Sequence, residues 1–185
     1  MEAYLDNSAT TRVDAQVQEL MKKLMDVDFG NPSSRHQKGV VAEGYIKEAR
    51  QKIAATLKVD PKEFIITSGG TESNNMALIG TALAAKRKGN HIITTAVEHP
   101  SVKATASFLE EQGFRITFLS VDSRGQISLE ELKEALTPDT ILVSIMYVNN
   151  EIGTIQPVEE AAKLVHATVP GAVFHVDAIQ AYGKV

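Results

Sequence analysis

The sequence has 185 residues, which is enough for one domain with a complete hydrophobic core. Hydrophobic residues make up 43% of it, charged residues 23%, and the formal net charge is -4, so the composition predicts a globular protein without a nucleic-acid-binding surface. There is no cysteine, which excludes disulfide bonds, Cys-ligated metals and thiol chemistry within the chain. No apolar run approaches the roughly 20 residues of a membrane span. The first residues also lack a basic-then-apolar leader, so we expect a cytoplasmic protein with no membrane partner.

Residues 1–35 are expected to form two polar, turn-rich segments on either side of one amphipathic helix. The first polar segment is Asn7–Thr11 and the second is Gly30–Ser34. Taken alone, such segments are most simply loop connectors. A division at residue 35 separates them from a domain that spans residues 36–185.

From residue 36 onward, predicted helices and strands alternate. A long helix comes first, with apolar residues at four-residue spacing: Val41, Tyr45, Ala49 and Ile53. Five short, non-alternating apolar runs predict strands buried on both faces: Phe64–Thr67, His91–Thr95, Phe114–Leu119, Ile141–Val148 and Ala172–Val176. Helical spacing recurs between the later runs, at Val102, Ala106 and Leu109, at Leu129, Leu132 and Leu136, and at Val158, Ala162 and Val165. We therefore expect an α/β fold with a mainly parallel sheet flanked by helices.

Two of these helices carry start signals. Ser128 and Glu131 have the spacing of a capping box, in which each side chain bonds the backbone N–H of the other residue. Pro157, followed by Glu159 and Glu160, suits the first turn of the last helix.

Polar residues follow four of the predicted strands. In open α/β sheets, ligands bind beyond the carboxyl ends of the strands. The residues at these ends are Ser68–Glu72, Glu98–Pro100, Asn149–Glu151, and Asp177 with Gln180. We expect Thr71, His99, Asn150 and Asp177 to lie at one edge of the sheet.

The segment Ser68–Thr71 has two chemical interpretations. Its two glycines allow the backbone to approach a ligand, and the following helix start offers free N–H groups to an anion, so it could bind phosphate. It matches neither of the common glycine-rich phosphate loops, and a plain tight turn explains it equally simply.

His99 and Asp177 also have rival explanations. His99 precedes a proline at a strand-to-helix junction, where it could cap the helix or serve as a proton donor and acceptor. Asp177 ends a buried strand, where a carboxylate needs a cation or hydrogen-bond donors, and a structural partner would suffice. His175 shares a strand face with it, but the five histidines have no metal-ligand spacing, so we predict no metal site.

Six segments taken together resemble the cysteine desulfurases of the class V aminotransferase group. They are Tyr4–Thr11, Gly30–His36, Thr67–Glu72, Glu98–Pro100, Asn149–Thr154 and His175–Gln180. Each is weak alone, but they occur in the right order and at similar spacing over the whole chain. The resemblance implies part of the large domain of a fold-type I transferase that depends on pyridoxal 5'-phosphate (PLP) and forms a homodimer.

The resemblance also implies roles for the matching residues. Thr71 and the backbone of Gly70 would hold the PLP phosphate. His99 would stack on the pyridine ring and carry protons. Asp177 would keep the pyridine nitrogen protonated, so that the ring can accept electrons from the substrate α-carbon.

The remaining implied contacts concern the ring edge and the substrate. Asn150 and Gln180 would hydrogen-bond the ring-oxygen side of PLP, and Asn150 would also contact the substrate. Asn31 and residues 7–11 would lie at the mouth of the active site. In the family reaction L-cysteine yields L-alanine, and its sulfur becomes an enzyme persulfide for iron–sulfur cluster assembly or thiolation. A sulfur-acceptor or scaffold protein is then a further expected partner.

Several family features have no counterpart in this sequence. The lysine that binds PLP follows the aspartate in a Ser-x-His-Lys setting, and Lys184 does not match that setting. The persulfide cysteine, the arginine that binds the substrate carboxylate and the small C-terminal domain are also missing. We therefore expect an N-terminal portion of the enzyme that is inactive by itself.

Three alternatives remain open at the level of sequence. One is a sister class V enzyme, such as a selenocysteine lyase or an aminotransferase. Another is a non-catalytic PLP-fold module for binding or dimerisation, which the missing lysine and cysteine favour. The third is a nucleotide-binding α/β domain, which the lack of a phosphate-loop signature disfavours.

Overall fold

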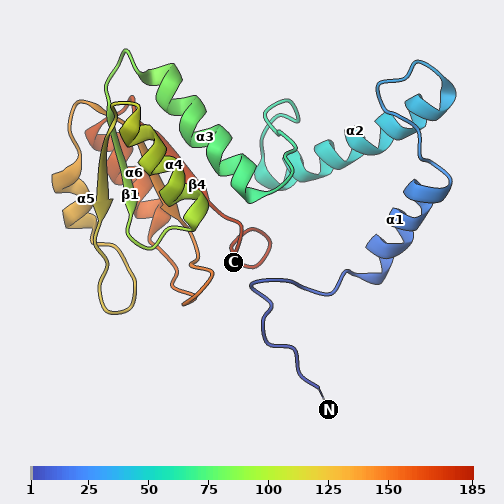
Figure 1. Cartoon of the computed structure of the whole chain (residues 1–185), viewed down its shortest axis with the longest axis horizontal. Coiled ribbons are helices and arrows are strands. Elements are labelled where there is room, and N and C mark those ends of the chain that lie inside the picture. Colours follow the sequence, from blue (N-terminus) through green and yellow to red (C-terminus); the bar gives the residue numbers. More distant parts are fainter. Residues whose placement is uncertain (1) are drawn as a thin grey trace. The chain divides into compact units, whose positions relative to one another are not determined.

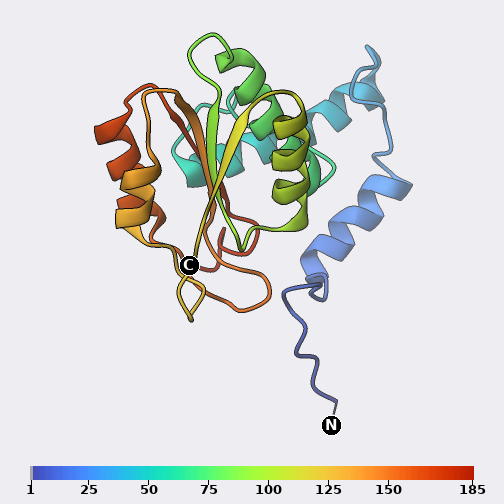
Figure 2. The same cartoon turned by 60° about the vertical axis from the view of Figure 1, so that its left-hand side comes forward.

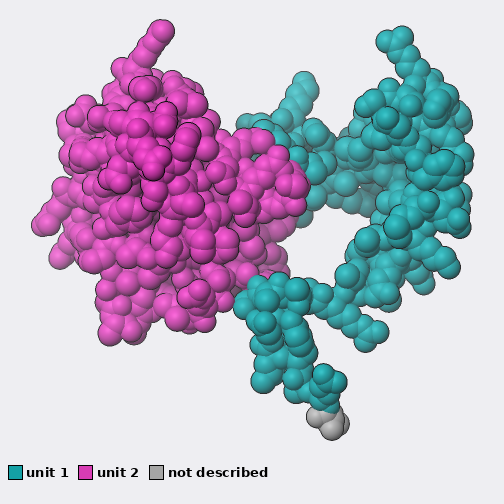
Figure 3. Space-filling model, viewed as in Figure 1, with its two compact units in different colours: residues 1–66 teal, residues 67–185 magenta. Residues whose placement is uncertain are grey.

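The computed structural model describes residues 2–185, which divide into two compact units (Figure 3). The first unit comprises residues 1–66 and the second comprises residues 67–185. This division is structural, and the functional boundary expected at residue 35 stays a prediction.

The first unit contains two helices, α1 (Ala15–Asp26) and α2 (Gln37–Leu57). α1 begins where the Asp14 side chain accepts a hydrogen bond from the Gln16 N–H at 2.9 Å, as expected for a helix N-cap. The Tyr45 hydroxyl donates to Asp28 at 2.8 Å and accepts from Lys23 at 2.8 Å, which ties α2 to the end of α1. The expected amphipathic helix and the long helix after it are both present.

The predicted strand at residues 64–67 is wrong. These residues pair with no other strand in the described part of the chain. Ile65 and Ile66 are 60% and 54% exposed, so neither side chain is buried. A β-branched apolar run forms a strand only when a neighbouring strand satisfies its backbone groups, and composition alone does not supply that neighbour.

The second unit is built on a four-stranded sheet in which every pairing is parallel. Its strands are β1 (His91–Thr95), β2 (Arg115–Leu119), β3 (Thr140–Met146) and β4 (Val173–Asp177), in the order β2-β1-β3-β4. The central strands β1 and β3 are buried throughout, as predicted. The outer strands β2 and β4 are partly exposed, because a strand at the edge of a sheet has a neighbour on one side only.

Helices cover both faces of this sheet, in layers that Figures 1 and 2 show. α3 (Gly70–Ala85) and α4 (Pro100–Glu111) lie on one face, where a buried cluster includes Leu78, Val102 and Leu109. α5 (Leu129–Ala135) and α6 (Val158–Thr168) lie on the other face. The α/β architecture expected from the alternating pattern is therefore confirmed.

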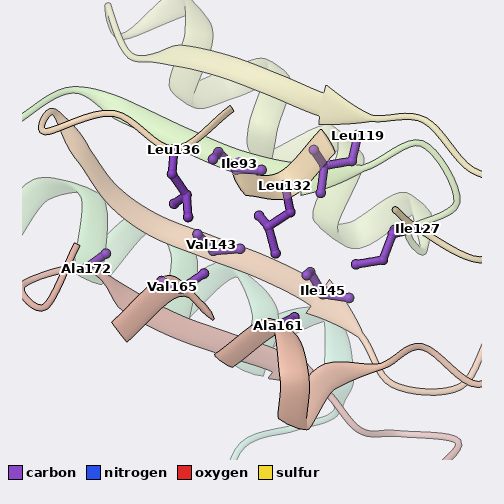
Figure 4. Packing of buried hydrophobic residues seen from close by; sticks show 10 residues of the cluster. All are labelled: Ile93, Leu119, Ile127, Leu132, Leu136, Val143, Ile145, Ala161, Val165 and Ala172. Atoms are coloured by element: carbon purple, nitrogen blue, oxygen red, sulfur yellow. The ribbon is translucent and has the colours of Figure 1, made fainter. Parts of the chain in front are cut away.

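Figure 4 shows the cluster beneath α5 and α6. Leu132 from α5 and Val165 from α6 are completely buried against Val143 and Ile145 of β3. Burying a side chain of this size stabilises the fold by about 1.5–3 kcal/mol. The helical spacing in the sequence thus identified Leu132 and Val165 correctly, but on α6 the structure buries Ala161 in place of the predicted Ala162.

The capping box predicted for α5 is only half present. The Ser128 hydroxyl accepts from the Glu131 N–H at 3.3 Å, as expected. The Glu131 carboxylate instead accepts from the N–H and hydroxyl of Ser120, at 2.9 and 2.6 Å. Ser120, directly after β2, therefore binds the Glu131 carboxylate in place of the Ser128 N–H. Pro157 stands one residue before α6, as its N-cap.

A buried histidine at the amino end of β1 joins three strands. Nδ1 of His91 on β1 lies 2.8 Å from the Thr140 hydroxyl on β3, and Nε2 lies 2.8 Å from the Thr117 hydroxyl on β2. Burial, followed by the nearby Arg115 cation, lowers the pKa of His91 to about 4. His91 is therefore a neutral structural residue at physiological pH.

Among the helices of residues 2–185, none combines the length and the apolar character needed to cross a membrane.

Candidate functional site

The carboxyl ends of the parallel strands bring three of the predicted site residues to one edge of the sheet. His99 is the N-cap of α4, four residues after β1. Asn150 follows β3, and Asp177 is the last residue of β4. Thr71 joins them from the start of α3, since Asn74 in the next turn of that helix touches Asp177.

Asp177 is 6% exposed and holds its carboxylate with two hydrogen bonds. Oδ2 accepts from Nδ2 of Asn74 at 2.8 Å, and Oδ1 accepts from the backbone N–H of Ile179 at 3.1 Å. These donors offset part of the cost of burying a carboxylate. They give Asp177 the structural partners that the sequence left open, and they fix the direction of its oxygens.

Asn74 extends this arrangement to His99. Its Nδ2 also donates to the Ser101 hydroxyl at 3.0 Å, and that hydroxyl lies 2.8 Å from Nδ1 of His99. The Ser101 N–H donates to the same ring nitrogen at 3.1 Å, so His99 caps α4, which was the simpler interpretation of this residue. A continuous chain of hydrogen bonds thus runs from Asp177 to His99.

The start of α3 has the features of an anion site. The first N–H groups of this 16-residue helix have no partner within the helix and point toward its N-terminus. Glu72 in the first turn is directed back to Ser68, whose N–H and hydroxyl each donate to it at 2.6 Å and thereby lower the pKa of Glu72. Thr71 is exposed, and Gly70 is half-buried.

Gly70 lies close to the turn that follows β4. A Cβ atom at Gly70 would collide with the Cδ1 atom of Ile179. The helix start and the end of β4 are therefore neighbours, and the absence of a side chain at Gly70 permits this approach.

A pocket of about 260 Å³ opens between the segment after β1 and the segment after β3. Its walls include Glu98, His99, Lys103 and Asn150. Asn149 shapes one wall, since its Nδ2 donates to the Val97 carbonyl at 2.9 Å while its Oδ1 accepts from two N–H groups of the following turn. Asn150 is thereby placed on the pocket wall.

Glu98 is a buried carboxyl group that sequence reasoning did not single out. It is 2% exposed, and its Oε1 accepts from the Met146 N–H at 2.8 Å and the Thr95 hydroxyl at 2.9 Å. Its Oε2 is buried without a hydrogen-bond partner among the described residues. Burial raises the pKa of Glu98 to about 7, and the charge of Asp177 adds to the rise, against the two hydrogen bonds. Its sequence neighbourhood did not reveal this burial, because the Met146 N–H that it meets lies 48 positions away in the chain.

Two predicted residues have local partners. Gln180 is half-buried in the turn after β4, where its Oε1 accepts from Lys184 at 3.1 Å. Asn31 belongs to the first unit, where its Oδ1 accepts from the Ser33 N–H at 2.9 Å and closes a turn. Asn31 and the other predicted site residues therefore belong to different units, and its role at the mouth of the site stays a prediction.

His175 does not share the environment of Asp177, although the two lie on one strand. Its Nδ1 lies 2.9 Å from the Ser144 hydroxyl on β3, and burial lowers the pKa of His175. It therefore belongs to the interior of the sheet and not to the edge.

Known proteins are similar to this chain in sequence and in fold. The family model of aminotransferase class-V matches residues 3–185. The chain is 50% identical over 184 residues to "Cysteine desulfurase IscS" of Dictyoglomus turgidum, covering 100% of this chain and 46% of that protein. It is 48% identical over 182 residues to "Cysteine desulfurase IscS" of Methanosarcina thermophila, covering 98% of this chain and 45% of the relative.

Solved structures agree with the sequence matches. A "NIFS-LIKE PROTEIN" superposes with a TM-score of 0.97 at 44% identity, over 100% of this chain and 51% of its own. DndA from Streptomyces lividans has a TM-score of 0.86 at 47% identity, over 99% and 51% of the two chains. The chain spans about half the length of the curated relatives it matches. It belongs to the aminotransferase class-V family and, within that family, to the cysteine desulfurase group.

Proposed function

We propose that this chain supplies the cofactor-binding half of a PLP-dependent cysteine desulfurase, which converts L-cysteine to L-alanine. The observation that carries this proposal is the hydrogen-bond chain from Asp177 through Asn74 and Ser101 to His99, at the carboxyl edge of a parallel sheet. Membership of a PLP-dependent family supports the choice of cofactor.

The start of α3 suits the phosphate of PLP. A dianion is stabilised by the free N–H groups and the positive end of a helix dipole. Gly70 allows the backbone to come close, and Thr71 adds an exposed hydroxyl that can donate. Glu72 does not oppose the phosphate, because its carboxylate is already turned to Ser68.

The buried edge beside α3 suits the pyridine ring. Asp177 would accept a hydrogen bond from the protonated ring nitrogen, and the donors from Asn74 and Ile179 hold its carboxylate ready for that contact. His99 would lie against the ring face, while Asn150 and Gln180 would donate to the ring oxygen. When bound, PLP would withdraw electrons from the substrate α-carbon.

The remaining parts of the proposal concern the substrate and the partners. Asn150 lines the 260 Å³ pocket, so it would contact the L-cysteine substrate there. Asn31 and the rest of residues 1–35 would contribute to the mouth of the site. The complete enzyme would be a homodimer that passes sulfur to an acceptor or scaffold protein, for iron–sulfur clusters or thiolated products.

A labelling experiment tests whether this chain binds PLP and whether it is inactive by itself. The 185-residue chain is titrated with PLP, reduced with borohydride, digested and analysed by mass spectrometry, and alanine release from L-cysteine is measured in parallel. We expect saturable PLP binding, scattered substoichiometric lysine labelling and no alanine, because the sequence has no cysteine and no lysine in the family setting.

Two outcomes would contradict the proposal in different ways. One stoichiometric lysine adduct with cysteine-dependent alanine release would show that the chain is catalytically complete. Absence of saturable PLP binding would favour a non-catalytic module of the same fold. In the sister-enzyme alternative, the complete protein would act on selenocysteine or an amino donor in preference to cysteine.

A further inference from the structure

We propose that Asn74 and Ser101 are positioning residues that fix the tautomer of His99, so that the neutral ring carries its proton on Nε2 and presents a donor to the ligand. The tautomer follows from contacts within residues 74–177 alone. Only the identity of the ligand atom that meets His99 rests on the proposed function.

The directions of the hydrogen bonds are set at Asp177. An ionised carboxylate can only accept hydrogen bonds. The amide atom of Asn74 that lies 2.8 Å from Oδ2 is therefore Nδ2, since a carbonyl oxygen there would face a carboxylate oxygen with no hydrogen between them. The same nitrogen lies 3.0 Å from the Ser101 hydroxyl, so it donates its second hydrogen to that oxygen.

Ser101 connects Asn74 to His99. Its hydroxyl oxygen accepts from Asn74 and lies 2.8 Å from Nδ1 of His99. The backbone N–H of Ser101 donates to the same nitrogen at 3.1 Å. A ring nitrogen that accepts from a backbone N–H carries no hydrogen of its own, so the Ser101 hydroxyl also donates to Nδ1 and the proton of the neutral ring is on Nε2.

This arrangement limits what His99 can do in the pocket. Its free ring nitrogen is a hydrogen-bond donor, so the ligand atom that faces it must be an acceptor, such as an anionic oxygen or a thiolate sulfur. Nε2 can take up a proton only after it has given its own away. The resemblance implied that His99 carries protons, and the structure adds that the resting state binds an acceptor first.

Nuclear magnetic resonance tests the tautomer without any cofactor. Two-bond ¹H–¹⁵N spectra of the ligand-free chain, with ¹⁵N-labelled histidine and at a pH where histidine is neutral, distinguish the two ring nitrogens. His99→Gln identifies the resonances of His99 by their loss. We expect a protonated Nε2. A proton on Nδ1 would overturn the proposal and leave the proposed function untouched.

Variants test whether Asn74 and Ser101 set this state. Ser101→Ala and Asn74→Leu should both shift the Nδ1 resonance of His99 toward that of a ring nitrogen without a bonded hydroxyl. Ser101→Thr keeps a hydroxyl, so its Nδ1 resonance should stay at the native position. Asn75→Leu is the matched control, because Asn75 bonds the Thr71 carbonyl and the Thr105 hydroxyl instead. No shift in Ser101→Ala, or equal shifts in Asn74→Leu and Asn75→Leu, would contradict the proposal.

Discussion

Asn74 donates a hydrogen bond to Asp177 at 2.8 Å, although the two residues lie 103 positions apart in the sequence. This contact joins the helix that offers its N-terminus to an anion with the strand that ends in a buried carboxylate. It makes the phosphate end and the ring end of the proposed cofactor site parts of one rigid arrangement.

Asp177→Ala should weaken PLP binding far more than His175→Ala does. Losing one partner of a buried charge pair costs ~3–5 kcal/mol, which corresponds to a rise in Kd of about 100-fold or more. His175 is the matched control on the same strand, since its ring bonds Ser144 inside the sheet. Kd values from equilibrium dialysis of the two variants provide the measurement, and equal values would refute the role of Asp177.

Glu98→Gln should make the fold more resistant to mild alkali. The folded-state pKa of Glu98 is raised from 4.5 to about 7, so the native state favours the protonated form. The protonated Glu98 therefore contributes stability that is fully present below pH 4.5 and is lost as the pH rises through 7. The total loss in unfolding free energy is about 3 kcal/mol. Glutamine resembles the protonated acid and does not titrate.

Urea unfolding between pH 4.5 and 8.5 measures this effect. The difference in unfolding free energy between Glu98→Gln and the native chain should grow with pH. A control at the exposed Glu130, as Glu130→Gln, should show a nearly constant difference. A constant difference for Glu98→Gln as well would mean that Glu98 is ionised in the folded protein across this range.

His91 should produce the opposite dependence on the acid side. Its folded-state pKa is lowered from 6.5 to about 4, so the unfolded chain takes up the proton first. Stability present above pH 6.5 is lost as the pH falls toward 4, by up to about 3 kcal/mol. His91→Gln should flatten this acid slope, whereas His166→Gln, at an exposed helical site, should leave it unchanged. Thermal unfolding at pH 7 and pH 4.5 measures how much stability each protein loses on acidification. If His91→Gln loses as much stability as the native chain does, the prediction is wrong.

Leu132→Ala should destabilise the second unit by about 2–5 kcal/mol, because it leaves a cavity in the cluster beneath α5 and α6. Leu83→Ala on α3 is the control, since Leu83 is an exposed leucine in a helix. Its cost should stay within about 0.5 kcal/mol. Denaturant midpoints compare the two, and similar losses would show that Leu132 is not part of a tightly packed core.

The sheet was predictable from the sequence wherever a short apolar run also has a neighbouring strand to pair with. Four short apolar runs became parallel strands, because helices between them bring each strand back to the same direction. The run at residues 64–67 had the same composition, but no neighbouring strand pairs with it. Glu131 likewise had the spacing of a capping box, and Ser120 provided a competing pair of donors.

The candidate site was predictable only in part. The strand-end rule and the resemblance predicted His99, Asn150 and Asp177, which the structure places at or within four residues of the carboxyl ends of their strands. Asn74 and Glu98 were missed, because their partners lie 103 and 48 positions away in the chain. A helical asparagine and a loop glutamate carry no local sign of burial. Only the folded arrangement shows which distant donor or acceptor each one meets.

The contacts of His91 that hold the strands together lie away from the edge of the sheet where a ligand would bind. His91 fastens β1 to Thr117 and Thr140 at the end opposite the ligand edge. Backbone amides near this bridge should exchange with solvent only through unfolding of the whole unit. The strands are thus held in register by side chains that lie away from the edge where a ligand would bind, so contacts made at that edge need not contribute to holding the sheet together.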